Sequence, residues 1–275
     1  MRPISKHPLL SFFVLSYLFS WLVGIPQLLS ARGIIGLHIP QAVEALAAFG
    51  PFAAAVVVLW VCGNRRGMHD LFVSLRAWRV SSQWFAFACL SPFAVMFTAL
   101  ALTDGTGALF SEQLAAELFV GSALFELLIV SGLAQGLGEE PGWRGFALPL
   151  LRKRFGPLLA SLAIFPVWLC WHLPFFLARP EFQLGAWIGF SAGIFAAAVW
   201  CTFIYDATRS VLMLILWHAL INITRAISLA VSMEAFLMFG QVVFVVAAIV
   251  VVYWLIARPS TYNERGGNNP QQQIL

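Results

Sequence analysis

The sequence predicts an all-α fold, a polytopic transmembrane helix bundle, and three observations support this prediction. Hydrophobic residues make up 61% of the chain and charged residues only 10%, whereas about a quarter of a typical soluble domain is charged. Long apolar segments recur along the chain, and Lys and Arg are concentrated in alternate loops between them. A soluble protein of this composition could not cover its surface with polar groups, so the bilayer is the expected solvent.

Eight segments are long enough to span the hydrocarbon core, which takes about 20 apolar residues in a helix. Helices are expected rather than barrel strands, because a barrel strand alternates apolar and polar residues over only about ten positions. The first segment lacks a small-residue cleavage site and is interpreted as a retained helix. The expected spans are Leu9–Leu28, Ala42–Cys62, Trp84–Thr103, Leu118–Leu137, Leu158–Leu177, Ala186–Tyr205, Leu212–Val231 and Ala235–Ile256.

The basic residues give an independent test of this count, because with eight spans alternate loops share one side of the membrane. One side holds only Arg32, Arg179 and Arg225. The other side holds Arg2, Lys6, Arg65, Arg66, Arg76, Arg79, Arg144, Arg152, Lys153, Arg154, Arg209, Arg258 and Arg265. Cytoplasmic loops carry the excess of Lys and Arg, so both termini are expected in the cytoplasm. We expect a multi-pass protein of the cell membrane, in a bacterial inner membrane.

One domain accounts for nearly the whole chain. Residues 1–258 form the expected transmembrane helical domain, and residues 259–275 form a polar cytoplasmic tail that is expected to be disordered. The Arg-rich loop Gly63–Gln83 is expected to lie along the cytoplasmic surface. Despite the net charge of +4, no basic stripe with interleaved aromatic residues is present, so nucleic acid is not an expected partner. The four Cys residues form no CxxC pair and are interpreted as buried thiols.

A small group of polar residues stands in or beside the apolar segments. Ionisable side chains at membrane depth cost several kcal/mol and therefore indicate a functional site. The group consists of Glu139, Glu140, Arg144, His172, His218 and Asn222. Glu126 also falls within the fourth segment, and this site gives it no role.

The spacing of these residues indicates a chemistry. Residues four apart share a helix face, so His218 and Asn222 lie together, and Glu140 precedes Arg144 in the favourable order for an ion pair. That pair can fix the backbone while Glu139 remains available to take a proton from water. Imidazole and amide groups could bind a metal or donate hydrogen bonds to an oxyanion. Each element alone could also be structural, as a clamp or as an interhelical hydrogen bond.

The depths of these residues disagree when they are counted from the predicted boundaries. Glu139 follows the fourth span directly, at the cytoplasmic face, and His218 lies close to that face in the seventh span. His172 lies about 14 residues into the fifth span, which is deep in the membrane at about 1.5 Å per residue. We expect all four catalytic candidates, Asn222 included, to meet in one cavity open to the cytoplasm. This requires the fifth helix to tilt or to begin later than predicted.

In order and spacing, these motifs resemble those of the CPBP membrane proteases, which include CAAX prenyl endopeptidases and bacteriocin-processing or immunity proteins (the ABI family). The matching motifs are Glu139-Glu140-x-x-x-Arg144, Trp168-x-x-x-His172 and His218-x-x-x-Asn222. Each is weak alone, but three in order over roughly residues 45–225 are specific. Trp168 replaces the usual Phe of the second motif, and because an aromatic ring is retained we expect a packing role for it.

The resemblance implies a role for each residue of the motifs. Glu139 would activate water with the help of His172, while His218 and Asn222 would stabilise the oxyanion and Glu140 and Arg144 would support the site. The cofactor is either none or zinc held by Glu139, His172 and His218. The metal-free form is favoured, because Asn is an uncommon zinc ligand but a good hydrogen-bond donor.

The predicted function is that of an intramembrane endopeptidase of the CAAX type, acting by a glutamate or a metallopeptidase mechanism. Its expected partners are membrane lipids and a peptide or lipid-modified protein substrate, either a prenylated CAAX protein or a bacteriocin-like peptide. The alternative is a non-catalytic membrane scaffold or an immunity factor that acts by binding. A transporter is less well supported, because the paired broken helices and internal repeats typical of transporters are not found.

Overall fold

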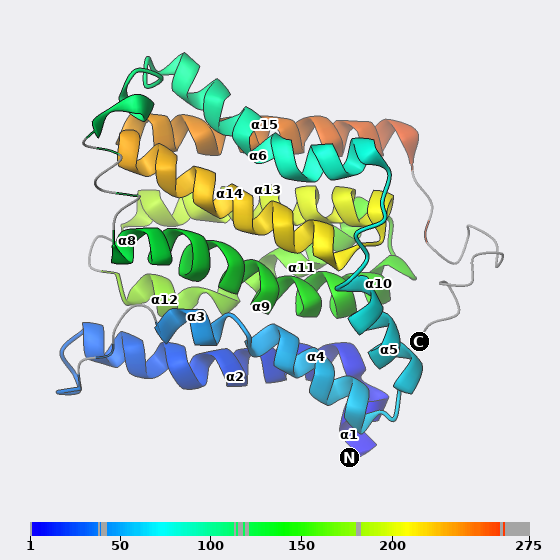
Figure 1. Ribbon diagram of the computed structural model, residues 1–275. Helices are drawn as coiled ribbons and strands as arrows, with labels where there is room; N and C mark the ends of the chain where they lie inside the picture. The colour runs from blue at the N-terminus through cyan, green and yellow to red at the C-terminus, as the bar shows by residue number, and fades with distance from the viewer. Residues whose placement is uncertain are drawn as a thin grey trace.

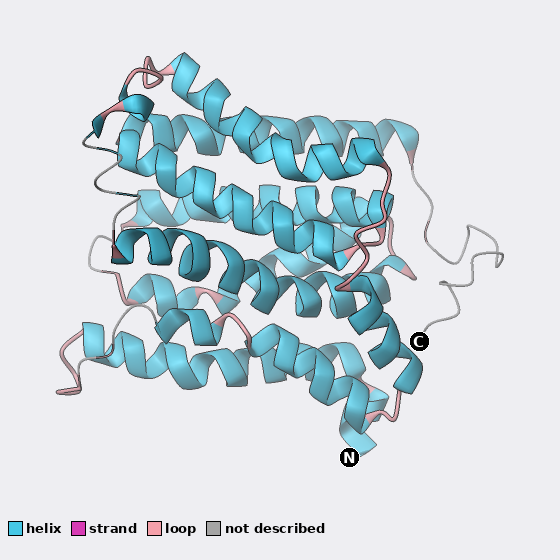
Figure 2. Ribbon diagram, in the orientation of Figure 1, coloured by secondary structure: helices cyan, strands magenta, loops and turns pink. Residues whose placement is uncertain are grey.

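The computed structural model describes residues 2–37, 39, 43–112, 114, 118, 121–179, 183–258 and 261. Every regular element within these ranges is helical, and the long helices run roughly parallel to one another in stacked layers (Figures 1 and 2). The predicted fold class, a polytopic transmembrane helix bundle, is therefore confirmed. The predicted tail from residue 259 lies outside the described residues, except for Thr261.

Six helical stretches of the described chain are long and apolar enough to cross a membrane. They are α2 (Pro8–Ala31), α3 with α4 (Glu44–Ala47 and Gly50–Val61), α6 (Ser82–Leu102), α13 (Leu184–Thr208), α14 (Val211–Val231) and α15 (Met233–Ala257). Each overlaps one predicted span. The predicted fifth span is divided into the shorter helices α11 (Pro157–Trp171) and α12 (Leu173–Leu177). A total of eight spans and cytoplasmic termini remain predictions.

Shorter helices lie mostly toward the ends of the bundle. Helix α1 (Arg2–Lys6), helix α5 (Arg65–Ser74) and the C-terminal end of α15 are found at one end (Figure 1). Helix α5 lies in the predicted surface loop and begins at Asn64, whose side chain accepts a hydrogen bond from the Gly67 N–H at 2.8 Å. A 3₁₀ turn covers Ala108–Phe110. Because α1 and the C-terminal end of α15 lie at the same end of the bundle, the arrangement fits an even number of spans.

The predicted end of the fourth span is wrong, and the start of that span lies partly outside the described residues. The helical path runs through Leu137 to Arg152 as α8 (Ser122–Phe125), the π-helical η3 (Glu126–Ala134), α9 (Gln135–Gly142), the π-helical η4 (Trp143–Ala147) and α10 (Leu148–Arg152). The charges of the Glu-Glu-x-x-x-Arg motif were interpreted as a boundary, but they are buried inside the bundle.

This longer helix removes the disagreement in depth between Glu139 and His172. Helices α10 and α11 are joined by the short connection 153–156 and run in opposite directions. Glu139 lies about 13 residues before that connection and His172 about 16 residues after it. At about 1.5 Å per residue, both lie roughly 20 Å or more from the same end of the bundle. No special tilt of α11 is needed.

Three glycines bring the backbones of neighbouring helices close to α9, which lies between α4 and α14 (Figure 1). A Cβ atom at Gly142 would lie 2.4 Å from the Pro51 carbonyl oxygen, and one at Gly138 would lie 2.5 Å from the Ala48 oxygen. On the other side, a Cβ at Gly136 would approach the Ile215 oxygen at 2.7 Å. Small residues permit this contact in membrane bundles, and it fixes the position of α9 between α4 and α14.

The Gly142→Ala variant is expected to lower the thermal unfolding midpoint in detergent. Backbone atoms of α4 cannot move aside as a flexible side chain could, so overpacking should cost about 1–3 kcal/mol. Gly189→Ala in α13 is the matched control, because no atom lies within 4 Å of the added Cβ. Equal midpoints for the two variants would contradict the role assigned to the α9 glycines.

Candidate active site

Glu139 is buried in the bundle and is bound by a side chain from another helix. Its carboxylate belongs to α9 and is only 2% exposed, and its Oε2 accepts a hydrogen bond from Nε1 of Trp168 at 2.6 Å. Trp168 lies on α11 and is also 2% exposed. The expected packing role of Trp168 is therefore incomplete, because its indole N–H is also a hydrogen-bond donor. Oε1 of Glu139 remains for a water molecule.

Glu140, Arg144 and His218 form a buried network beside Glu139. Oε1 of Glu140 accepts hydrogen bonds from Nη1 of Arg144 at 2.8 Å and from Nδ1 of His218 at 2.6 Å. The three residues are 0%, 1% and 7% exposed, respectively. The sequence predicted the pairing of Glu140 with Arg144 but not the contact with His218. Because Nδ1 is bound to Glu140, Nε2 is the nitrogen of His218 that can meet a substrate.

The indole ring of Trp168 is surrounded by the polar groups of the site. The guanidinium carbon of Arg144 lies 4.0 Å from the ring centroid, a cation–π contact. The imidazole of His218 lies edge-on to the ring, with centroids 6.1 Å apart, and the His172 ring is 5.7 Å away. One aromatic side chain from α11 thus contacts polar residues of η4, of α14 and at the end of α11.

His172 stands at the end of α11, one turn after Trp168. Its Nδ1 lies 2.7 Å from the Trp168 carbonyl oxygen. A carbonyl oxygen can only accept, so Nδ1 carries the hydrogen, and Nε2 of the neutral ring is an acceptor. Phe190 and Trp171 pack against the ring, with centroids at 5.3 Å and 4.7 Å. These contacts fix both the tautomer and the orientation of the imidazole.

Asn222 is bound to a residue that the sequence analysis missed. Its Nδ2 donates a hydrogen bond at 2.8 Å to Oε1 of Gln135. Gln135 lies one turn before Glu139 on α9, and Asn222 lies one turn after His218 on α14, so the two helices are joined at successive turns. A polar side chain four residues before Glu139 in an otherwise apolar segment was the available signal for Gln135.

Both zinc binding by Glu139, His172 and His218 and a site without metal remain predictions. In the part of the chain that the structure describes, no three His, Cys, Asp or Glu side chains are grouped as metal ligands. Oε2 of Glu139 and the Nδ1 atoms of both histidines are engaged in hydrogen bonds within the protein. Oε1 of Glu139 and the Nε2 atoms of both histidines take no part in these bonds, so they are the atoms that would face a water molecule or a metal ion.

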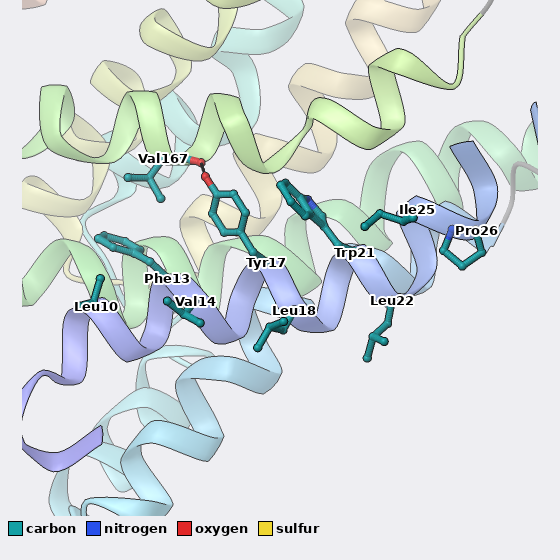
Figure 3. Close-up of a pocket in the computed structure, with 10 residues that line it drawn as sticks. All are labelled: Leu10, Phe13, Val14, Tyr17, Leu18, Trp21, Leu22, Ile25, Pro26 and Val167. Carbon is teal, nitrogen blue, oxygen red and sulfur yellow. Dashed lines mark hydrogen bonds between the residues drawn. The ribbon is translucent and has the colours of Figure 1, made fainter. Parts of the chain in front are cut away.

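An apolar groove of about 720 Å³ lies elsewhere, on the outer side of α11 against α2 (Figure 3). The Tyr17 hydroxyl donates to the Val167 carbonyl oxygen at 2.5 Å, and the Trp21 indole donates to the Trp171 oxygen at 3.0 Å. Val167 lines this groove, whereas the neighbouring Trp168 binds Glu139. The groove and the polar site therefore use different faces of the same helix.

Comparison with known proteins connects this arrangement to a family. Residues 121–224 match the sequence model described as type II CAAX prenyl endopeptidase Rce1-like. The chain is also 29% identical over 123 residues to CAAX prenyl protease 2 of Methanococcus maripaludis. That alignment covers 42% of this chain and 45% of the relative, so the chain matches less than half of the relative's length.

The matched segment contains every residue of the three motifs, from Glu139 to Asn222. It also contains their contacts with Gln135 and Trp168. The predicted multi-pass membrane character agrees with the six apolar helical stretches. In the order of its motifs and in both comparisons, the chain is similar to the CPBP family of CAAX protease-like membrane proteins.

Proposed function

We propose that this protein is an intramembrane endopeptidase of the CAAX type, which hydrolyses a peptide bond of a prenylated, membrane-bound substrate. The observation that carries the proposal is the Glu139 carboxylate, which is 2% exposed and held by one oxygen at 2.6 Å from an indole N–H. A buried carboxylate with its second oxygen available is suited to take a proton from water. The family and the name of the relative support the CAAX class of substrate.

In the proposed reaction, Oε1 of Glu139 removes a proton from water while the water oxygen attacks the scissile carbonyl carbon. Nε2 of His172 accepts a hydrogen bond from the same water and orients it. The carbonyl oxygen becomes an oxyanion in the tetrahedral intermediate. Glu139 then transfers its proton to the leaving nitrogen as the C–N bond breaks, which returns the carboxylate to its starting state.

The charges of the buried network support a role for His218 at the oxyanion. Glu139 and Glu140 bring two negative charges, and Arg144 brings one positive charge. The oxyanion role requires a His218 ring that carries a hydrogen on both nitrogens, and the positive charge of that ring would lie beside the two carboxylates. In this form Nδ1–H binds Glu140 and Nε2–H can donate to the oxyanion. Asn222 uses one amide hydrogen on Gln135 and retains a second for the same purpose.

The full chain reconstituted in liposomes tests the proposal. A peptide that ends in a farnesylated CAAX sequence, in which the lipid is attached to the Cys, is compared with the same peptide without the lipid. We expect mass spectrometry to detect cleavage of the farnesylated peptide within its CAAX sequence. Cleavage of an unmodified membrane peptide alone would reject the substrate class. Binding of the farnesylated peptide without any cleavage would reject the enzyme and favour the scaffold.

We also expect the active preparation to contain substoichiometric zinc and to retain its activity in a strong chelator. The reason is that Asn222, one turn from His218 on the same helix, is an uncommon zinc ligand but a good hydrogen-bond donor for an oxyanion. Zinc binds deprotonated ligands, so a zinc enzyme would lose metal to chelators. Elemental analysis and activity before and after chelation provide the measurement. Stoichiometric metal, with activity restored by zinc alone, would establish a metallopeptidase instead.

A further inference from the structure

The hydrogen bond between Trp168 and Glu139 is a feature that the usual residue of the family motif cannot form. Phe stands at this position in the motif that the chain resembles, and a phenyl ring has no polar hydrogen to donate. Here an indole N–H reaches Oε2 of Glu139 at 2.6 Å, and both side chains are 2% exposed. The bond joins α9 to α11 at the proposed catalytic carboxylate.

We propose that Trp168 is a positioning residue, whose indole N–H holds one carboxylate oxygen of Glu139 so that the other faces the attacking water. This inference rests on the proposed function. A free Glu side chain has three rotatable bonds, and its carboxylate would sample several directions. A hydrogen bond that holds the carboxylate in its productive direction excludes the other directions. Misplacement of a reacting group by about 1 Å can lower the rate by as much as 10²-fold.

The contacts around the indole ring keep its N–H aimed at Glu139. The Arg144 guanidinium covers one face at 4.0 Å from the ring centroid, and His218 meets the ring edge-on at 6.1 Å. Arg144 is itself held by Glu140 at 2.8 Å. Rotation of the indole would break the contact with Arg144 as well as the bond to Glu139. These contacts therefore fix the orientation of the indole N–H that donates to Glu139.

The Trp168→Phe variant separates positioning from packing, because it keeps an aromatic ring under Arg144 and removes only the donor and part of the ring system. With the farnesylated CAAX peptide, we expect kcat to fall by about 10-fold to 10²-fold, with little change in KM and with a fall in thermal midpoint similar to that of the control below. A role in packing alone would lower the thermal midpoint to the same extent but leave the kcat of the folded fraction unchanged.

Trp200→Phe is the matched control. Trp200 is also 2% exposed, and its indole N–H donates to the Val243 carbonyl oxygen at 3.1 Å, between α13 and α15. This variant loses a buried indole hydrogen bond that does not involve the proposed catalytic residues. We expect a lower thermal midpoint with wild-type kcat. A wild-type kcat for Trp168→Phe, or equal losses of kcat in both variants, would overturn the inference.

A second measurement does not depend on cleavage. In protein labelled with ¹⁵N at the indole nitrogens, the Trp168 N–H signal is assigned by its loss in Trp168→Phe. We expect Glu139→Gln to shift this signal and to leave the Trp200 signal in place. An unchanged Trp168 signal would reject the positioning role. A wild-type protein that cleaves no peptide but shows this shift would reject the proposed function and leave the Trp168–Glu139 contact established.

Discussion

Glu139→Gln is expected to eliminate turnover of the farnesylated CAAX peptide and to leave the helix bundle folded. An amide cannot take the proton that water must lose, and general base catalysis contributes about 10²–10⁴-fold to a rate. Gln has nearly the same volume, and its oxygen can still accept the hydrogen bond from Trp168. We therefore expect kcat to fall by about that factor, with KM and the thermal midpoint close to those of the wild type.

The matched control for this prediction is Glu126→Gln. Glu126 lies in η3 on the same helical path, but its side chain is exposed. The Glu126→Gln variant makes the same chemical change outside the buried network, so its kcat should equal that of the wild type. Wild-type activity in both variants would show that Glu139 is not the base. Inactivity of both, with normal folding, would point to a general requirement for carboxylates instead.

The transmembrane helices were the part of the fold that could be predicted from sequence. Lipid leaves no partner for an open backbone, so a long apolar segment must be a helix. The prediction Trp84–Thr103 corresponds to α6 (Ser82–Leu102), and Leu212–Val231 corresponds to α14 (Val211–Val231). Composition alone determines such elements, because each needs only its own residues to satisfy its backbone hydrogen bonds.

The boundary of the fourth span could not be predicted in this way. On a hydropathy scale, Glu140 and Arg144 each add an unfavourable free energy of insertion into the membrane. In the bundle, however, the two charges form an ion pair and neutralise each other. Gly138 and Gly142 then allow the α4 backbone to cover this part of the helix. Burial of the motif thus depends on partners distant in sequence, and a local window cannot contain them.

The candidate site was partly predictable for the same reason. The pair Glu140 and Arg144 follows from a spacing of four on one helix. The bonds of His218 to Glu140 and of Asn222 to Gln135 cross from α14 to α9, and that of Trp168 to Glu139 crosses from α11. Such pairs depend on how neighbouring helices are aligned. Spacing within one helix identifies the face that carries the polar groups, but not their partners.

Glu140→Gln is expected to produce the largest loss of stability. Arg144 and His218 are both bound to the same oxygen of Glu140, and they are 1% and 7% exposed. An amide oxygen can still accept hydrogen bonds, but the negative charge that compensates the buried guanidinium is lost. Removal of one partner from a buried ion pair costs about 3–5 kcal/mol. A lower thermal midpoint and a reduced kcat should appear together, because His218 also loses the group that orients it.

Two further variants show whether the uncompensated charge is the cause. Asp206→Asn breaks another ion pair with a buried arginine, Arg152, whose Nη2 lies 2.7 Å from the Asp206 carboxylate. It should lower the midpoint and spare the kcat of the folded protein. Adding Arg144→Met to Glu140→Gln removes the unpaired guanidinium and should recover part of the stability without restoring activity. If the double variant were less stable than Glu140→Gln alone, Arg144 would be stabilising the bundle mainly through its packing on Trp168.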